Sequence, residues 1–354
     1  MLPALAVTDT LAQTADSSVH TSGGWVLLPV IYYTPETKLA GGAFAMRLFA
    51  PESSATSRRT SALPFSVIYT QRKQIFVDLQ PDIYWHGATD HLSGAVGFSR
   101  FPDKFYGVGN STTPDDEEHF SADSWYLTVM YRHEVLPSWF AGVTFDFRHA
   151  RITEVEPDRL LSHGVLPGSG GGLLSGLGVS LSWDLRDNAY APSSGRFFSV
   201  AATTYGRLLG SDYQYTNYNI DLREYFSPGE GHVTGVQVYM NFIAGVAPFQ
   251  VLSRLGGESL MRGYYGGRFR DNDFVMVQAE HRVALWGRFG AAVFAAAGDV
   301  AGRLSRFSAR TVKTACGFGF RYAFNEEEKI NIRLDLGFCR EEFPGPVITI
   351  GEAF

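Results

Sequence analysis

The chain alternates apolar and polar side chains along most of its length. From Trp25 onward, segments of roughly ten residues, rich in aromatic side chains, follow one another and are separated by turn residues. Between positions 330 and 338 the even positions are apolar, whereas the odd positions include Asn331, Arg333 and Asp335. Side chains of a β-strand point alternately to its two faces. Each segment therefore predicts a strand with one apolar face and one face of polar or small residues.

The number and length of these segments favour a membrane barrel over a soluble sandwich, which would alternate as well. We count about sixteen segments, an even number that is typical of outer-membrane barrels. Their length is close to the ~9–11 residues that a tilted spanning strand needs. Their polar faces carry Asp and Arg at matching depth, as a water-filled lumen permits. The sequence thus predicts an all-β fold, a transmembrane antiparallel β-barrel of about 16 strands.

The connections between the segments are alternately short and long. The long ones cover about residues 101–121, 151–172 and 245–271. Outer-membrane barrels have short periplasmic turns and long external loops. An even number of strands then places both termini on the periplasmic side of the outer membrane. We expect a polar periplasmic tail over residues 1–24 and the barrel over residues 25–354.

Composition narrows the possible functions. Charged residues make up 19% of the chain and aromatic residues 14%, against a soluble average of about 25% charged. With 36 acidic and 30 basic residues, the net charge of −6 gives no electrostatic case for nucleic acid. No apolar run approaches the ~18 residues of a membrane helix. No catalytic motif such as G-x-S-x-G occurs, and two cysteines exclude a Cys-rich metal centre, so we expect no enzyme, no cofactor and no metal site.

The two cysteines are predicted to remain free. Cys316 and Cys339 lie on segments that are expected to form one hairpin. Cys316 shares its parity with apolar side chains, whereas Cys339 shares its parity with Arg333 and Asp335. A disulfide needs Cβ atoms within about 3.5–4.5 Å of each other, which opposite faces of a strand pair do not allow. We expect Cys316 to face lipid and Cys339 to face the lumen.

Several motifs occur in an order that resembles the BamA/TamA-type outer-membrane assembly-factor superfamily of surface-antigen barrels, which includes two-partner-secretion transporters. They are YYTPET at 32–37, FYGVGN at 105–110, WDLRDNAYAPSSG at 183–195, Arg262-Gly263-Tyr264 within the loop 245–271, and ITIGEAF at the C-terminus. The resemblance covers roughly residues 25–354. It implies a barrel whose long loop, residues 245–271, folds into the lumen.

The resemblance gives Arg262 a role. In this superfamily the loop arginine reaches a Glu and an Asp on the barrel wall. Glu280 matches the first acid, Ala296 replaces the second, and Asp335, which parity places inward, is the expected substitute. An unpaired guanidinium in a partly dry lumen is costly. The expected tether of the loop consists of Arg262, Gly263, Tyr264, Glu280 and Asp335. The alternative is a solvated loop arginine.

A second motif of this superfamily predicts a periplasmic turn. Its residues are Asp184, Arg186, Asp187, Asn188, Pro192 and Gly195. Asp and Asn followed by Pro and Gly are typical of turns, because their side chains and backbones suit turn geometry. A well-formed turn without a further role is the simpler interpretation.

The first and last strands are predicted to meet in a weak seam. Pro29 cannot donate a ladder hydrogen bond, Gly351 weakens the last strand, and Phe354 ends it. Where the superfamily usually has an apolar residue, this chain has Glu352. A poorly paired seam exposes backbone groups that can template an incoming strand. The alternative is that Pro29 only marks the start of the barrel.

The periplasmic polypeptide-transport-associated (POTRA) domains of the superfamily are expected to be absent, because about 24 residues before the barrel cannot form one. We therefore expect a scaffold or accessory subunit for outer-membrane protein assembly or transport. It would contact the lipid bilayer and a separate periplasmic protein or lipoprotein that supplies the missing module. The alternative is a structural or receptor barrel, or a passive pore, without insertase activity.

Overall fold

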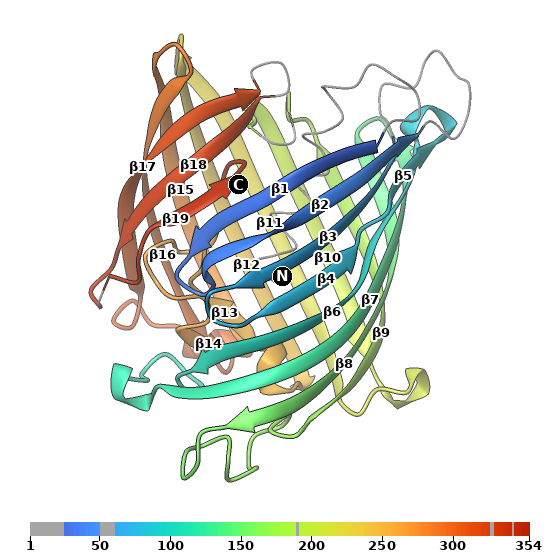
Figure 1. The fold of residues 1–354 in the computed structure, drawn as a ribbon, viewed down its shortest axis with the longest axis vertical. Helices are drawn as coiled ribbons and strands as arrows, with labels where there is room; N and C mark the ends of the chain where they lie inside the picture. The colour runs from blue at the N-terminus through green and yellow to red at the C-terminus, as the bar shows by residue number, and fades with distance from the viewer. Residues whose placement is uncertain (1–24, 50–60, 189–190, 326–328, 342) are drawn as a thin grey trace.

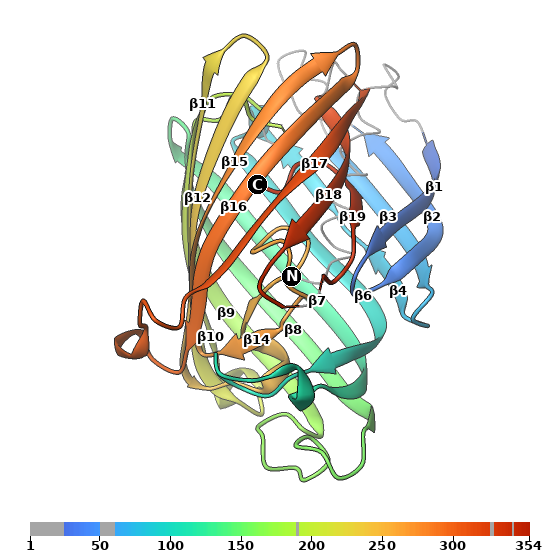
Figure 2. The same cartoon turned by 90° about the vertical axis from the view of Figure 1, so that its left-hand side faces the viewer.

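The computed structural model describes residues 25–49, 61–188, 191–325, 329–341 and 343–354. Within these ranges the chain forms one antiparallel β-barrel (Figures 1 and 2). The predicted periplasmic tail lies outside the described residues. Among the described residues, no helix is long and apolar enough to span a membrane.

The wall is built from consecutive strands. They are β1 (Trp25–Thr34), β2 (Lys38–Phe49), β3 (Ser61–Thr70), β4 (Ile75–Leu79), β5 (Asp82–Trp85), β6 (Asp90–Phe105), β7 (Glu118–Leu136), β8 (Trp139–Val155), β9 (Gly171–Asp184), β10 (Gly195–Tyr205), β11 (Gln214–Gly229), β12 (His232–Val246), β15 (Asp273–Trp286), β16 (Phe289–Ala301), β17 (Lys313–Asn325), β18 (Ile330–Phe338) and β19 (Val347–Ile350). Each pairs antiparallel with its neighbours, and β1 also pairs with β19, which closes the barrel.

The predicted number of strands is confirmed. β4 and β5 both pair with β3 and with β6. They are therefore two halves of one barrel strand, interrupted at Gln80 and Pro81, and the wall has 16 strands. Proline lacks the N–H that a ladder needs, so an interruption at Pro81 is expected. The predicted fold class, a transmembrane antiparallel barrel, is likewise confirmed.

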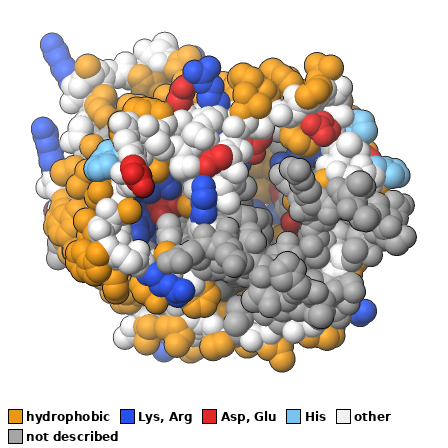
Figure 3. All heavy atoms as spheres, turned by 90° about the horizontal axis from the view of Figure 1, so that it is seen from above, with side chains coloured by type: hydrophobic (Ala, Val, Ile, Leu, Met, Phe, Trp, Pro, Cys, Tyr) orange, Lys and Arg blue, Asp and Glu red, His pale blue; other side chains and the backbone are white. Residues whose placement is uncertain are grey.

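Apolar and polar side chains divide between the two faces of the wall as the alternation predicts. On β18, Ile332 and Phe338 are exposed on the outside, whereas Arg333 and Asp335 are buried inside. Figure 3, viewed along the barrel axis, shows apolar side chains around the outer circumference. A lipid-facing belt and a charged interior are what a membrane barrel requires.

The two ends of the barrel differ. One end, here the short-turn end, has tight turns such as 137–138, 230–231 and 287–288. It carries stacked Trp139 and Trp183, whose ring centroids are 5.6 Å apart. Tryptophans are enriched where a protein crosses the membrane–water interface. The opposite end, here the long-loop end, carries the longer connections (Figure 2).

At the long-loop end, three strands extend further than the alternation predicts. The pairing of β6 with β7 continues to Phe105 and Glu118, and that of β7 with β8 continues to Val155. The expected loops 101–121 and 151–172 were therefore too wide. Period-two hydrophobicity ends where both faces of a strand are polar, but the backbone ladder continues beyond that point.

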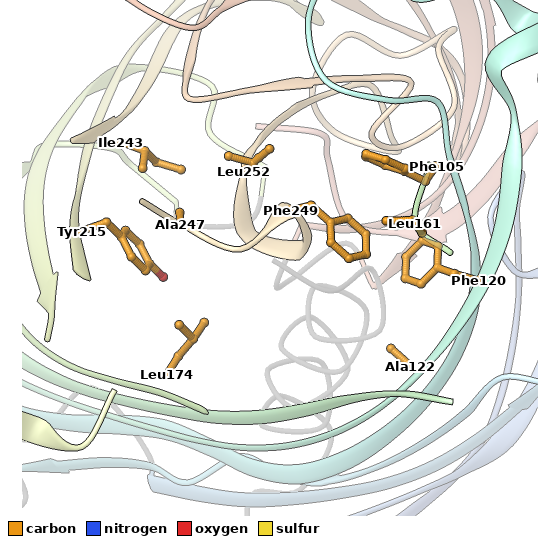
Figure 4. Close-up of a cluster of buried hydrophobic side chains, with 10 residues drawn as sticks. All are labelled: Phe105, Phe120, Ala122, Leu161, Leu174, Tyr215, Ile243, Ala247, Phe249 and Leu252. Atoms are coloured by element: carbon orange, nitrogen blue, oxygen red, sulfur yellow. The ribbon is translucent and has the colours of Figure 1, made fainter. Parts of the chain in front are cut away.

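The connection between β12 and β15 packs inside the barrel wall at the long-loop end. It contains η4 (Phe249–Val251), β13 (Ser253–Leu255) and β14 (Phe269–Asp271). Phe249 contacts Phe105 and Phe120 of the wall, with ring centroids 4.9 and 5.2 Å away. The cluster in Figure 4 consists of Phe105, Phe120, Ala122, Leu161, Leu174, Tyr215, Ile243, Ala247, Phe249 and Leu252. Barrel lumens are usually polar, so this apolar cluster makes the connection part of the folded interior.

The remaining helical segments are single 3-10 turns at the strand ends. They are η1 (His86–Ala88), η2 (Pro114–Asp116), η3 (Arg207–Leu209) and η5 (Leu304–Arg306). Both cysteines are free; Cys316 is exposed on the outside, and Cys339 is half-buried against Tyr264 and its neighbours. The two thiols therefore belong to different environments, as their parity predicts.

Candidate functional site

The tip of the internal loop is fixed by a buried arginine. Nη1 of Arg262 lies 2.6 Å from Oε2 of Glu280 on β15 and 2.6 Å from Oδ2 of Asp335 on β18. The guanidinium also lies over the ring of Phe294 on β16, 3.7 Å from its centroid. Arg262 is 2% exposed. A buried guanidinium between two carboxylates is a strong tether, because removing either partner leaves an uncompensated charge.

A second arginine joins the same two acids. Arg321 of β17 contacts Glu280 at 3.3 Å and Asp335 at 2.6 Å. Ala296, at the position of the superfamily's second acid, offers no carboxylate, and Asp335 reaches Arg262 from two strands further along the wall. The structure thus brings Arg262, Glu280 and Asp335 together into one charge network.

The residue after the arginine packs backbone to backbone on the wall. Gly263 has a φ of +118°, and a Cβ there would lie 2.9 Å from the nitrogen of Phe338. A Cβ on Gly337 of β18 would lie 2.6 Å from the nitrogen of Gly263. Only glycine combines that φ with so close an approach. Tyr264 then donates from its hydroxyl to the carbonyl of Thr314 at 3.3 Å, so all three residues of the Arg-Gly-Tyr motif contact the wall.

Further along the loop, motifs that are distant in sequence converge. The N–H of Gly266 donates to Oε1 of Glu36 at 2.6 Å, and the hydroxyl of Tyr265 donates to Asp103 at 2.9 Å. The N–H of Gly109 donates to the carbonyl of Arg270 at 2.7 Å. Burial raises the pKa of the Glu36 carboxyl above its ordinary value. The motifs at 32–37 and 105–110 therefore serve the loop, a role that alternation alone did not reveal.

Sequence reasoning missed two of the loop's wall partners. Gly337 is buried on the lumen side of β18, and nothing in the alternation of side chains marks a glycine there as a docking point. Glu341, beyond the end of β18, pairs with Arg268 through two hydrogen bonds of 2.6 and 2.9 Å. Glu341 could have been suggested by its negative charge, which complements the arginines of the loop.

The seam is much less extensively paired than the rest of the wall. β1 pairs with β2 over ten residues in continuous register, including Pro29 opposite Ala43. Toward β19, the described residues form one pair, Tyr33 with Ile348. Gly351 follows the end of β19 and has a φ of +85°. The edge of β1 from residue 25 to residue 32 is therefore left without a strand partner among the described residues.

The third seam residue is not in the seam. Phe354 is 7% exposed and lies next to Tyr225 of β11, with ring centroids 6.3 Å apart. Tyr225 is itself buried inside the wall. The structure therefore separates Phe354 from Pro29, although the sequence placed both at the junction of the first and last strands.

The turn motif between β9 and β10 crosses part of the short-turn end. Asp187 accepts hydrogen bonds from the N–H groups of Ser193 and Ser194 and pairs with Nζ of Lys329 at 3.0 Å. Arg282 of β15 donates to the carbonyl of Pro192 at 2.9 Å. Lys329 precedes β18, so this turn contacts strands on another part of the wall. It is more than an isolated turn.

The other residues of this motif form the turn itself. Arg186 pairs with Asp184 at 2.7 Å, and Oδ1 of Asn188 accepts the N–H of Ala191 at 2.9 Å. Gly195 has a φ of +102°, and a Cβ there would lie 2.1 Å from a backbone oxygen. These contacts explain why Asp, Asn and Gly occupy their positions.

Comparison with known proteins assigns this barrel to a family. The model of the Omp85 superfamily domain matches residues 61–334, most of the chain. The chain belongs to the Omp85 superfamily. An Omp85 barrel of 16 strands implies an outer-membrane location, where its apolar belt contacts the lipid bilayer. No curated protein matches the chain in sequence.

Solved structures share the fold of this Omp85 barrel. BamA from Haemophilus ducreyi lacking POTRA domains 1–3 has a TM-score of 0.64 and 13% identity, covering 93% of this chain and 69% of that one. CdiB from Acinetobacter baumannii has a TM-score of 0.61 and 9% identity, covering 94% and 60%. CdiB from Escherichia coli has a TM-score of 0.59 and 10% identity, covering 93% and 62%. At these identities the likeness shows the fold, and the chain spans less than two thirds of either CdiB.

The arrangement in this Omp85 barrel is suited to holding segments in place. Its charged groups pair with one another across strands, and its glycines allow a loop to lie directly on the wall. In the part of the chain that the structure describes, no group of three or more His, Cys, Asp or Glu side chains is placed to hold a metal ion. What the site can do is fix the loop on one side of the seam while the seam itself stays sparsely paired.

Proposed function

We propose that this chain assists the assembly or transport of other outer-membrane proteins, as a scaffold or accessory subunit. The observation that carries the proposal is the edge of β1, which pairs with β19 at Tyr33 and Ile348 alone among the described residues. An unpaired strand edge presents N–H and C=O groups that can template another strand. A separate periplasmic protein or lipoprotein would deliver the client, and both termini would lie in the periplasm.

The internal loop supports this role by keeping the wall beside the seam in shape. Arg262 fixes the loop to β15 and β18 from within. The strands next to the seam therefore have a support that does not depend on β1. Such a barrel can lose its few seam contacts without losing its fold. The proposal assigns no catalytic step and no cofactor to the chain.

The second candidate is a structural or receptor barrel whose seam never opens. It is favoured by the contacts of the turn motif with Lys329 and Arg282, which link the turn to strands elsewhere at the short-turn end. A passive pore is less well supported, because the apolar cluster around Phe249 lies inside the barrel at the long-loop end. Polar lumens conduct ions and solutes more readily than apolar constrictions.

A seam-locking experiment separates the first two candidates. Tyr33→Cys with Ile348→Cys places two thiols at the seam pair, and Ile31→Cys with Gly41→Cys places two at an ordinary β1–β2 pair. Cells depleted of the chain and complemented with each oxidised variant are compared by a census of their outer-membrane proteins. We expect reduced levels of outer-membrane proteins in cells with the locked seam and normal levels in cells with the control variant. A normal census with a completely crosslinked seam supports the static barrel instead.

A further inference from the structure

We propose that residues 351–354 form an internal latch, in which Arg321 holds Glu352 inside the barrel and thereby keeps β19 too short to cover the edge of β1. The latch rests on the proposed function, since it names what regulates the seam.

The contacts of Glu352 define the latch. Its Oε2 lies 2.8 Å from Nε of Arg321, and its Oε1 accepts a hydrogen bond of 2.6 Å from Nδ2 of Asn331. The side chain of Glu352 is fully buried. Both of its carboxylate oxygens are therefore occupied by donors on β17 and β18, which point into the lumen.

The backbone turns inward immediately before this residue. The N–H of Gly351 still donates to the carbonyl of Asn331 of β18 at 2.8 Å, in register with the β18–β19 ladder. Gly351 itself adopts a φ of +85°, a left-handed conformation that favours glycine, and the chain leaves the wall after it. Phe354 then packs beside Tyr225 and close to Gly235, on β11 and β12. Figures 1 and 2 both place the C-terminus within the outline of the barrel. The contacts of Glu352 and Phe354 hold the last residues of the chain in the lumen rather than in the wall.

The parity of β19 shows what an extended tail would do. Ile348 is exposed on the outer face of this strand, whereas Val347 and Thr349 are buried on its inner face. Continued alternation would turn Glu352 outward, toward lipid. The pairing of Tyr33 with Ile348 would also place position 352 opposite Pro29, which has no N–H to offer. A carboxylate on the lipid face is unfavourable, so the charge of Glu352 selects the inward conformation.

Arg321 couples the latch to the loop. It contacts Glu280 and Asp335, the two acids that also hold Arg262. When Arg262 is absent, both acids lose one cationic partner and draw more strongly on Arg321, which then holds Glu352 less firmly. Loop docking and tail docking therefore support each other, and by linkage the support is reciprocal.

The test measures where the tail lies, in purified protein in detergent, without any assay of activity. Leu28→Cys with Ala353→Cys places two thiols opposite each other only if the tail extends along β1 in the register of Tyr33 and Ile348. Mild oxidation should give little crosslinking in this background. Adding Glu352→Leu should raise the ratio of crosslinked to free protein at least about tenfold, which corresponds to ~1.4 kcal/mol. Glu352→Gln should give a smaller increase.

Controls separate the latch from general loosening. Glu224→Gln removes a carboxylate from an exposed pair with Arg196 and should leave the ratio unchanged. Arg262→Ala should raise the ratio when Glu352 is present and add nothing after Glu352→Leu. Equal crosslinking in all variants that retain normal heat-modifiability would overturn the latch, whatever the chain does in cells. The latch and the proposed function can fail separately. If the crosslinking ratio responds as expected but seam locking leaves the outer-membrane proteins at normal levels, the latch is supported and the proposed function is wrong.

Discussion

The loop tip and the seam lie on neighbouring strands and are built in opposite ways. At the loop tip, one guanidinium binds two carboxylates, and two glycine backbones touch without side chains between them. At the seam, the described parts of β1 and β19 share one residue pair, whereas β1 and β2 share ten. The interior is densely connected at the place where the wall is most sparsely paired.

The difference indicates what holds the edge of the barrel. Breaking a buried ion pair costs about 3–5 kcal/mol, whereas a backbone hydrogen bond contributes about 0.5–1.5 kcal/mol net. The single seam pair therefore contributes less to the stability of the barrel edge than the ion pairs of Arg262 do. The strands beside the seam keep their place mainly through lumen contacts, and the seam can change its pairing at low cost.

The largest effect is expected where the loop touches the wall. Gly337→Ala introduces a Cβ that would lie 2.6 Å from the backbone nitrogen of Gly263, so the loop has to lift and Arg262 loses its acids. We expect a destabilisation of about 3–5 kcal/mol, seen as a lower heat-modifiability midpoint and faster proteolysis of the loop. Gly41→Ala is the matched control, because a Cβ there meets nothing within 4 Å. Equal behaviour of the two variants would mean that the loop does not rest on Gly337.

A smaller effect is expected from pH, through Glu258 in the loop. This side chain is 9% exposed, and its Oε2 has no hydrogen-bond partner among the described residues. Burial raises the pKa of Glu258 to about 7, while Arg333 opposes and Glu36 adds to the increase. The docked loop then binds this proton more tightly than the released loop. Stability from this group is fully present below about pH 4.5 and is lost as the pH rises through 7.

The measurement is the heat-modifiability midpoint of the wild type and of Glu258→Gln between pH 5 and pH 8. The wild type should lose stability as the pH rises, by no more than about 1.4 kcal/mol per pH unit. Glu258→Gln should flatten this dependence and be the more stable of the two at pH 8. Glu341→Gln serves as a control that also removes a carboxylate but should leave the pH dependence of the midpoint as it is in the wild type. Parallel curves for the wild type and Glu258→Gln would exclude Glu258 as the titrating group.

The smallest effect is a change in the reaction rate of a native thiol. Cys339 lies against Tyr264 at the loop tip, and burial raises its pKa above the ordinary thiol value. Arg262→Ala should expose it and speed its alkylation by a charged maleimide. Cys316, exposed on the lipid side, provides an internal control whose rate should stay constant. Intact mass with site mapping gives both rates, and a loop that is held by other contacts would leave the rate of Cys339 unchanged.

Much of this architecture could be predicted from local patterns. Alternation gave the strands their faces, and the same parity placed Glu280 and Asp335 inward, where the structure brings them to Arg262. Parity also separated Cys316 from Cys339. Such features are accessible to the sequence because the direction of a strand side chain depends only on its immediate neighbours along the chain.

The remaining features depend on contacts between distant segments. The docking of Gly263 on Gly337 is a contact between two backbones, and side-chain patterns carry no signal for it. Phe354 was expected in the last strand, but the bend at Gly351 sends it into the lumen. The bend follows from the charge of Glu352, whose partner, Arg321, is 31 positions away. Such partners are assigned only once the barrel has closed.

The edge of the barrel is held from inside rather than by the seam. Tyr33→Pro removes the backbone N–H of Tyr33, one of the two residues that pair across the seam. The β1–β2 ladder should tolerate this change, because Pro29, at a position of the same parity, already lies in that ladder without shifting its register. Arg262→Ala removes the lumen tether instead. The direct test compares the heat-modifiability midpoints of these two variants with the wild type. We expect a large decrease of the midpoint for Arg262→Ala and a small one for Tyr33→Pro. A decrease for Tyr33→Pro that equals or exceeds that of Arg262→Ala would show that the seam, and not the lumen tether, holds the edge.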